Sequence, residues 1–163
     1  MIPTDTFSPA PTQTRSGLAL SFRPLEAADI APVMALESQL QSHPWRRSSY
    51  EDCLAGRHHC WLAEASGELV GFVVVAWAGG DGELLNIAVA SQRQRQGVGE
   101  RLLALAFELV RPHASMMFLE VRLSNRNAIQ FYEREQFFEV GQRPNYYPSA
   151  RGREDALILA RQL

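Results

Sequence analysis

The stretch "QRQRQGVGERLLALAFELV" (residues 92–110) decides the fold, because a short glycine loop runs directly into a strongly apolar helix pattern. Gly97 and Gly99 stand two positions apart, behind arginine and glutamine side chains. From Val98 onward, apolar residues recur at the spacing of one helix face. A helix N-terminus presents unpaired backbone N–H groups and the positive end of the helix dipole, and both favour an anion. The stretch therefore predicts a phosphate-binding turn that opens a helix over residues 97–110.

Segments on both sides of this loop carry strand patterns separated by turn residues. The predicted strands cover residues 18–25, 59–64, 69–78, 83–89, 116–121, 137–143 and 154–160, with a loop over 144–152. The further predicted helices begin at Asp29, at Ser48 and at Asn125, whose side chains can cap them, and run to about Leu40, Gly56 and Arg134. The order of these segments predicts a mixed sheet, with an antiparallel first half, one strand–helix–strand crossover and a final hairpin. The expected class is therefore α/β (α+β).

The chain of 163 residues is long enough for one domain with a substantial core. Residues 1–17 are rich in Pro, Thr and Ser, which predicts a disordered tail. Residues 18–163 are then expected to form a single domain, in which about four helices flank a mixed, mostly antiparallel sheet.

Composition removes several classes of function. The net charge of -2 gives no broad nucleic-acid footprint, and no apolar stretch approaches the roughly 18 residues of a membrane span. All 16 basic residues are arginine, so Schiff-base and P-loop lysine chemistry is excluded. Cys53, Cys60 and the four histidines have no metal-ligand spacing. We expect a cytoplasmic protein with reduced thiols and no metal.

Two phosphate ligands remain after the P-loop is excluded. A dinucleotide fold needs G-x-G-x-x-G with an acidic residue about 20 positions on. Glu120 has that spacing, but Leu102 replaces the third glycine. The glycines also follow an antiparallel meander, and the chain has room for only one crossover unit. The dinucleotide reading therefore survives on spacing alone, and acyl-coenzyme A is the other candidate.

Residues 94–99, "QRQGVG", match [Q/R]-x-x-G-x-[G/A] and resemble the signature of the GNAT superfamily of N-acetyltransferases. The order "NIAV", loop, helix, "LEV" and "SNRNAIQFYEREQF" resembles the core of that superfamily over residues 83 to 138. The resemblance implies a GNAT fold with a splayed strand pair at the coenzyme site and acetyl-CoA as co-substrate. The backbone of Ile87, Ala88 and Val89 would pair with the pantetheine arm. Main-chain N–H groups would hold the pyrophosphate, and these belong to Arg95, Gln96, Gly97, Val98, Gly99 and Glu100.

A closer resemblance covers roughly residues 18 to 160. The segments "HPW", "LEVRLSNRNAIQFYE" and "NYYPSARGREDALIL" are similar to the bacterial ribosomal-protein alanine N-acetyltransferase family. That family modifies the N-terminal alanine of small-subunit ribosomal protein eighteen. The resemblance implies a ribosomal-protein N-terminus as the peptide substrate, with no direct nucleic-acid or membrane partner. The chain departs from the family in its longer N-terminal tail and in "EQFFEV", which lacks a turn glycine.

Acetyl transfer needs a base that removes a proton from the acceptor amine and an acid for the leaving thiolate. Glu120 in the apolar strand "MMFLEVRL" is either desolvated or paired with an arginine such as Arg122, and a surface-facing position fits the pattern equally well. By resemblance Glu120 is the general base. Tyr132 fits a core residue by pattern and the general acid by resemblance. Asn125 is a helix cap that would also contact the coenzyme.

The resemblance further suggests that Tyr147 and Trp45 line the groove for the acceptor's first residues. Glu83, Glu154 and Asp155 are candidate partners for a basic residue in the acceptor. We expect direct transfer in a ternary complex. The alternatives are a GNAT enzyme that acts on a lysine side chain or a small-molecule amine, and a coenzyme-sensing protein without turnover. The presence of both Glu120 and Tyr132 argues against the sensor.

Overall fold

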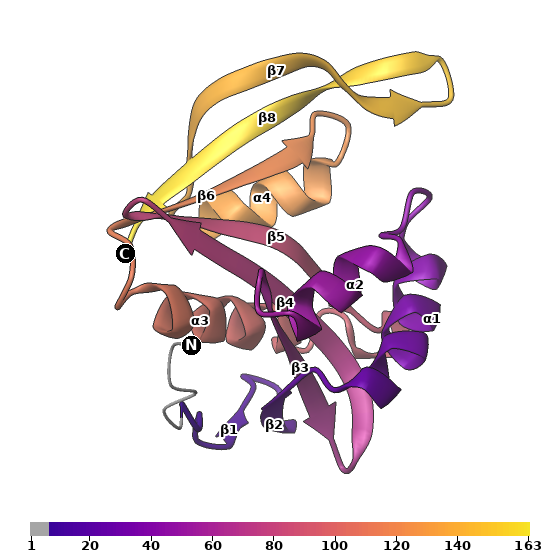
Figure 1. Cartoon of the computed structure of the whole chain (residues 1–163), viewed down its shortest axis with the longest axis vertical. Coiled ribbons are helices and arrows are strands. Elements are labelled where there is room, and N and C mark those ends of the chain that lie inside the picture. The colour runs from indigo at the N-terminus through magenta and orange to yellow at the C-terminus, as the bar shows by residue number, and fades with distance from the viewer. Residues whose placement is uncertain (1–6) are drawn as a thin grey trace.

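Side chains of the strand β4 (Glu68–Ala78) alternate between two helical layers in the computed structural model, which describes residues 7–163 (Figure 1). Phe72 and Val74 point into a cluster with the first two helices, whereas Val73 and Val75 point into a cluster with the third and fourth. All four of these side chains are fully buried, as strand periodicity predicts for a sheet that is covered on both faces. The helices are α1 (Ile30–Leu40), α2 (Arg47–Leu54), α3 (Val98–Val110) and α4 (Arg126–Arg134).

Eight strands form one sheet in the order β1-β2-β3-β4-β5-β6-β8-β7. All neighbours are antiparallel except β5 and β6, which α3 joins as the single crossover. The predicted fold class, a mixed and mostly antiparallel sheet with four helices, is therefore confirmed. The other strands are β1 (Thr12–Gln13), β2 (Ala19–Pro24), β3 (His59–Ala65), β5 (Asp81–Val89), β6 (Met116–Arg122), β7 (Phe138–Ser149) and β8 (Gly152–Gln162).

The strands β5 and β6 share only a short stretch of ladder and then diverge (Figure 1). Residues 81–83 of β5 pair with residues 116–118 of β6, and no later residue of β5 pairs with β6. A β-bulge interrupts β5, because Val75 faces Leu84 and Val74 faces Asn86, which leaves Leu85 as the extra residue. The sheet therefore opens into a fork beyond Glu83.

Two predicted helix caps are wrong and one is confirmed. The Asp29 carboxylate does not cap α1; it accepts the N–H of Glu26 at 2.8 Å and binds the Arg23 guanidinium, which also lowers its pKa. Ser48 lies inside α2, which begins one residue earlier. Asn125 accepts the N–H of Ala128 at 3.2 Å and caps α4 as predicted. The prediction for Asp29 failed because its carboxylate binds Arg23 and Glu26 instead of the N–H groups of α1.

The predicted loop over residues 144–152 is mostly strand. β7 continues to Ser149 and forms a long hairpin with β8. The loop-forming residues mark a bulge instead: Pro144 cannot donate to the ladder, and Asn145 has a positive φ of 53° and donates its N–H to the Asp155 carboxylate. The turn-forming residues do bend the backbone, but the bond from Asn145 to Asp155 allows the strand to continue beyond the bend.

The N-terminal segment also differs from its prediction. Residues 12–13 form β1, and a tight turn leads from them into β2. Thr14 is buried in this turn, and its N–H donates to the carbonyl of Leu18 at 2.9 Å. The predicted disordered tail is thus wrong for residues 12–17, and its first six residues lie outside the described part of the chain.

Candidate functional site

The fork between β5 and β6 leaves one backbone edge of β5 without a strand partner within residues 7–163. Ile87, Ala88 and Val89 pair on their other side with β4. The side chains of Ile87 and Val89 pack toward α3, and that of Ala88 packs toward α1 and α2. These three residues are therefore core residues whose free main-chain edge could bind an extended, amide-containing ligand.

The loop between β5 and α3 follows this free edge. Within the described chain, no hydrogen bond joins the backbone N–H groups of residues 95 to 100 to a protein acceptor. Arg95 and Gly97 have positive φ values of 60° and 89°, so the loop curls tightly before α3 begins at Val98. Six successive free donors at a helix N-terminus are an arrangement that can bind an anion such as a diphosphate.

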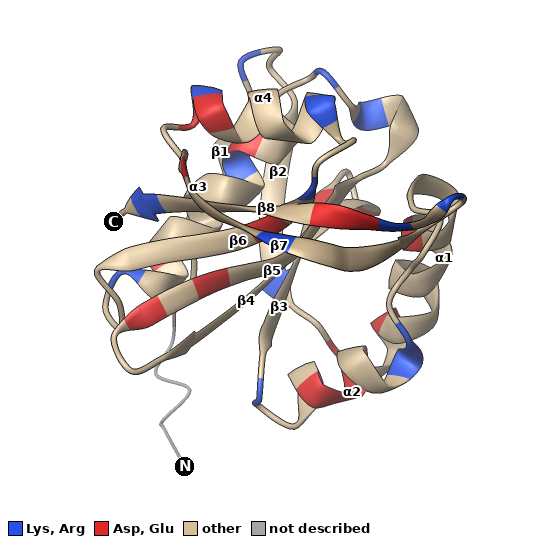
Figure 2. Cartoon of the chain, turned by 90° about the horizontal axis from the view of Figure 1, so that it is seen from above, with Lys and Arg blue, Asp and Glu red and all other residues tan. Residues whose placement is uncertain are grey.

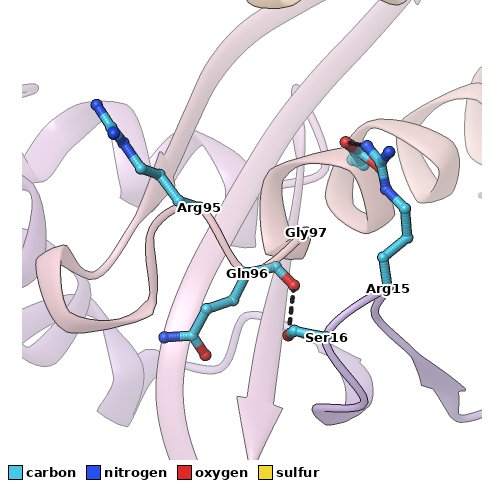
Figure 3. A pocket seen from close by; sticks show the side chains of 6 residues that line it. Arg15, Ser16, Arg95, Gln96 and Gly97 are labelled. Atoms are coloured by element: carbon cyan, nitrogen blue, oxygen red, sulfur yellow. Dashed lines mark hydrogen bonds and ion pairs between the residues drawn. The ribbon is translucent and has the colours of Figure 1, made fainter.

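Both glycines of the loop lie close to other segments of the chain. A Cβ atom at Gly97 would lie 3.2 Å from the Cβ of Thr14, and one at Gly99 would lie 3.5 Å from the ring of Phe131. Gly97 therefore admits the β1–β2 turn, while Gly99 faces α4. A cleft of ≈ 380 Å³ lies against the loop (Figure 3), and its lining residues are Arg15, Ser16, Arg95, Gln96, Gly97 and Glu100.

Glu120 lies on the face of β6 opposite the buried residues Met117, Leu119 and Val121. The strand thus turns this carboxylate toward the face of the sheet that carries α1 and α2. It is partly exposed and forms an ion pair with Arg143 of β7, whose Nε lies 2.7 Å from Glu120 Oε1. The expected arginine partner was Arg122, so pairing is confirmed as one of the two predicted environments but with a different residue. The sequence could not show this pairing because it depends on the register of the final hairpin.

Arg122 is engaged elsewhere on the same face. It donates to the Glu154 carboxylate at 3.0 Å and to His43 Nδ1 at 3.3 Å, and its guanidinium lies 4.5 Å from the ring centre of Tyr147. Figure 2 shows basic and acidic positions alternating over β6, β7 and β8, as these pairs require. Arg122 therefore connects β6, the final hairpin and the loop between α1 and α2.

Tyr146 and Tyr147 lie near Glu120, and a third tyrosine, Tyr132, lies near Tyr147. Burial raises the pKa of Tyr132 above its usual range, and the neighbouring Tyr147 raises it further. Burial, followed by the negative charge of Glu120, raises the pKa of Tyr147 to about 12. A hydrogen bond to Glu120 is the main cause of a raised pKa of Tyr146. All three phenols consequently stay protonated at neutral pH and can donate hydrogen bonds.

A buried carboxylate on α1 was missed by the sequence analysis. Glu37 is fully buried, and its two oxygens accept the peptide N–H of Trp45 and the hydroxyl of Tyr50. The amide of Asn86, next to the bulge of β5, donates to it at 2.8 Å. Glu37 follows Val33 by four positions on the apolar face of α1, so a charged residue on that stripe was an available signal. This network, called the Glu37 cluster, fixes the α1–α2 loop against β5.

Trp45 therefore serves first as a packing residue, since its ring lies 5.5 Å from that of Tyr50. Of the three acidic candidates, Glu154 and Asp155 are occupied by Arg122 and by the N–H of Asn145. Glu83 is exposed, forms none of the described ion pairs, and acts electrostatically on Tyr146. Of the three candidates, Glu83 is therefore the one that could bind a basic side chain of the acceptor.

Cys53 and Cys60 are free thiols that pack among the side chains of α1 and α2, away from the loop and from Glu120. Among residues 7–163, no cluster of three His, Cys, Asp or Glu side chains has the geometry of a metal site. In the same part of the chain, no helix has both the length and the apolar character that crossing a membrane would require.

The chain matches the sequence profile of the acetyltransferase (GNAT) family over residues 27–137. It is 35% identical over 137 residues to the ribosomal protein bS18-alanine N-acetyltransferase of Escherichia coli (strain K12), which covers 83% of this chain and 93% of that relative. The crystal structure of the ribosomal-protein-S18-alanine N-acetyltransferase from Escherichia coli superposes with a TM-score of 0.80 at 33% identity, covering 88% of this chain and 93% of that one.

A more distant structure shares the fold alone. NAA60 of Arabidopsis thaliana, solved in complex with acetyl-CoA, has a TM-score of 0.77 at 17% identity, with coverage of 88% of this chain and 98% of that chain. The fork, which the resemblance implied, and the loop, which the glycine pattern indicated, both lie within the matched profile. The chain therefore belongs to the acetyltransferase (GNAT) family.

Proposed function

We propose that this chain is an N-α-acetyltransferase that moves acetyl from acetyl-CoA to the N-terminal alanine amine of ribosomal protein bS18. The free edge of β5, which leads directly to six unbonded N–H groups, is the observation that carries the proposal. The relatives at 32–35% identity named for this activity support the choice of acceptor.

The coenzyme site uses backbone groups for most of its contacts. The amides of a pantetheine arm can pair with Ile87, Ala88 and Val89 as an added strand, because that edge of β5 has no other partner in residues 7–163. The N–H groups of residues 95 to 100 then face the diphosphate. Asn125 already accepts an N–H at the start of α4 with its oxygen, so only its amide NH₂ remains for the coenzyme.

We assign Glu120 as the general base. An α-amino group has a pKa of about 8, so the acceptor is largely an ammonium ion at neutral pH but loses its proton readily. A carboxylate that acts directly or through water is therefore a strong enough base to remove that proton. Glu120 is bound to Arg143 in this structure, and the positively charged acceptor amine competes for the same oxygens. Binding of the acceptor thus displaces Arg143 or shares the carboxylate with it.

We assign Tyr132 as the hydrogen-bond donor to the leaving sulfur. Its raised pKa keeps the phenol protonated throughout the neutral range. Burial also makes Tyr132 a weaker acid than a free tyrosine. Tyr132 therefore stabilises the thiolate by a hydrogen bond and supplies the proton as negative charge develops on sulfur.

The acceptor peptide is proposed to lie over the face that holds Glu120, between the α1–α2 loop and the final hairpin. Tyr147 and Tyr146 supply neutral hydroxyl donors there. Glu83 supplies an unpaired negative charge for a basic side chain near the acceptor's N-terminus. Cys60 lies on β3, which β4 and β5 separate from the Glu120 strand β6, and Cys53 packs in the same cluster as Cys60. We therefore infer direct transfer in a ternary complex without an acyl-cysteine.

The test is acetyl-CoA with short peptides that carry the N-terminal sequence of bS18, followed by mass spectrometry. Acetylation of the free α-amine is expected, while a peptide with a blocked N-terminus and an internal lysine should remain unmodified. Modification of the lysine alone would support the alternative of a side-chain or small-amine acetyltransferase. Exchange of the segment "NYYPSARGREDA" for that of another GNAT protein should change peptide selection but not coenzyme binding.

The expected cellular setting follows from this substrate. We propose a cytoplasmic enzyme that meets its acceptor as a protein chain and needs neither membrane nor direct nucleic-acid contact. The interspersed charges of Figure 2 are consistent with a peptide partner. Metal-independent activity is also expected, and it can be checked by assay in the presence of a chelator.

A further inference from the structure

The β1–β2 turn lies directly against the phosphate-binding loop. The Ser16 hydroxyl donates to the carbonyl of Gln96 at 2.9 Å, and Thr14 packs against Gly97 (Figure 3). Thr14 is itself buried, and its hydroxyl accepts the N–H of Leu18 at 3.1 Å. The turn is thus held against the loop by the Ser16 hydrogen bond and by the packing of Thr14. The family profile begins only at residue 27, so this turn lies outside it.

The turn places Arg15 at the wall of the cleft. Its guanidinium pairs with Glu100 in the first turn of α3, while 77% of its side chain remains exposed. Arg95 stands on the other side of the Gln96–Gly97 segment in Figure 3 and forms none of the ion pairs within residues 7–163. Two guanidinium groups therefore flank a cleft of ≈ 380 Å³ that already presents free N–H groups.

Glu100 raises an electrostatic conflict that Arg15 resolves. A carboxylate in the first turn of a helix is favourable when no other anion is present, because it faces the positive end of the dipole. The same carboxylate repels a phosphate that approaches this helix end. A guanidinium beside it cancels the repulsion and has further N–H donors free, since five are available in a fixed fork.

We propose that Arg15 is a coenzyme-binding residue, whose guanidinium turns from Glu100 toward a phosphate of coenzyme A when the coenzyme binds. Glu100 holds Arg15 at the cleft until then. The inference rests on the proposed function, because it requires that the loop binds coenzyme A. Coenzyme A offers two phosphate sources, the diphosphate and the 3′-phosphate, and the experiment distinguishes them.

The test measures binding of coenzyme A by titration calorimetry, without turnover. For Arg15→Gln we expect a dissociation constant about tenfold higher than that of the wild type, because one charge-assisted bond is lost. Arg101→Gln is the matched control, since Arg101 is next to Glu100 on α3 but lines a different hollow; the affinity of this variant should stay within about twofold of wild type. Thermal unfolding of both variants should match the wild type, as Arg15 is an exposed residue.

Two further titrations identify the phosphate and the role of Glu100. If Arg15 meets the 3′-phosphate, Arg15→Gln and wild type bind dephospho-coenzyme A equally; if it meets the diphosphate, the variant is weaker for both ligands. Glu100→Gln should bind coenzyme A more tightly than the wild type. Equal affinity of Arg15→Gln and wild type for coenzyme A, or weaker binding by Glu100→Gln, would overturn the inference. Failure of the wild type to bind coenzyme A would instead reject the proposed function.

Discussion

Two carboxylates on the same face of the sheet have opposite surroundings. Glu37 is fully buried and accepts hydrogen bonds from three neutral donors on three different segments. Glu120 is partly exposed, and its partners, the Arg143 guanidinium and the Tyr146 hydroxyl, both belong to β7 and lie at the surface. A carboxylate saturated by fixed donors supports structure, whereas one with a displaceable partner is available for chemistry. On the proposed function, the contrast separates the residue that holds the α1–α2 loop in place from the residue that acts as general base.

The largest effect is expected for Glu37→Ala. The substitution leaves Tyr50, Asn86 and the N–H of Trp45 without their acceptor, and unmet buried donors cost about 1–3 kcal/mol each. We expect a loss on the order of 4 kcal/mol in the free energy of unfolding, measured by urea titration.

Glu37→Gln is the companion variant, because it keeps one acceptor oxygen and folds more readily than the alanine form. It should raise KM for the peptide more than KM for acetyl-CoA, since the α1–α2 loop loosens. A stability unchanged from wild type in both variants would contradict the structural role of the Glu37 cluster.

Glu120→Gln should lower activity strongly and stability only slightly, which is the reverse of the effect expected for Glu37→Ala. Removal of a general base lowers kcat/KM about 10²-fold, which corresponds to ~2.7 kcal/mol of transition-state stabilisation. The free energy of unfolding should change by less than about 1 kcal/mol, because an exposed ion pair contributes little. Full activity of this variant at neutral pH would remove Glu120 from the role of base.

Tyr132→Phe tests the other half of the chemistry. The phenyl ring preserves the packing against Phe137, whose ring centre lies 5.6 Å away, so stability should be nearly unaffected. We expect kcat to fall about tenfold, with the affinity for acetyl-CoA within about twofold. The opposite result, a raised dissociation constant with unchanged kcat, would make Tyr132 a binding residue.

The smallest effect on stability is expected for a third carboxylate, Asp29, whose ion pair with Arg23 has a purely structural role. The hydrogen bond from Arg23 holds its pKa below the usual range. A lowered pKa in the folded state stabilises the protein above the unfolded pKa of ~3.9, and this contribution is lost as the pH falls through the folded value. Asp29→Asn should therefore lose about 1 kcal/mol or less at pH near 7 and nothing at the acid end. Urea unfolding at a series of pH values measures the difference, and activity should be unchanged.

Local patterns predicted most of the fold. The glycine loop, the helix after it, the meander before it and the Asn125 cap are all encoded within short windows of sequence, and each was confirmed. The errors arose where distant residues compete for the same group. Arg23 binds Asp29 in place of a cap, and Asp155 lets β7 continue through Asn145.

The site was predictable only to the level of its family. The positions of Glu120 and Tyr132 could be named from the motif, and their roles stay predictions. The partners could not be named, because Arg143 reaches Glu120 through the register of β7 on β8, and Arg15 reaches Glu100 across 85 residues of sequence. Only Glu37 left a local signal, as a charged residue on an apolar helix face.

On the proposed function, the fork in the sheet makes the stability of this protein depend on how much coenzyme is bound. Without a ligand, β5 and β6 carry open hydrogen-bonding edges in the middle of the sheet, where most proteins have none. On the proposed function, a ligand present at 100 times its dissociation constant adds about 2.7 kcal/mol to the free energy of unfolding. A cell depleted of coenzyme A would then hold this enzyme in a form that is not only inactive but also easier to unfold and more open to pairing with the strands of other chains.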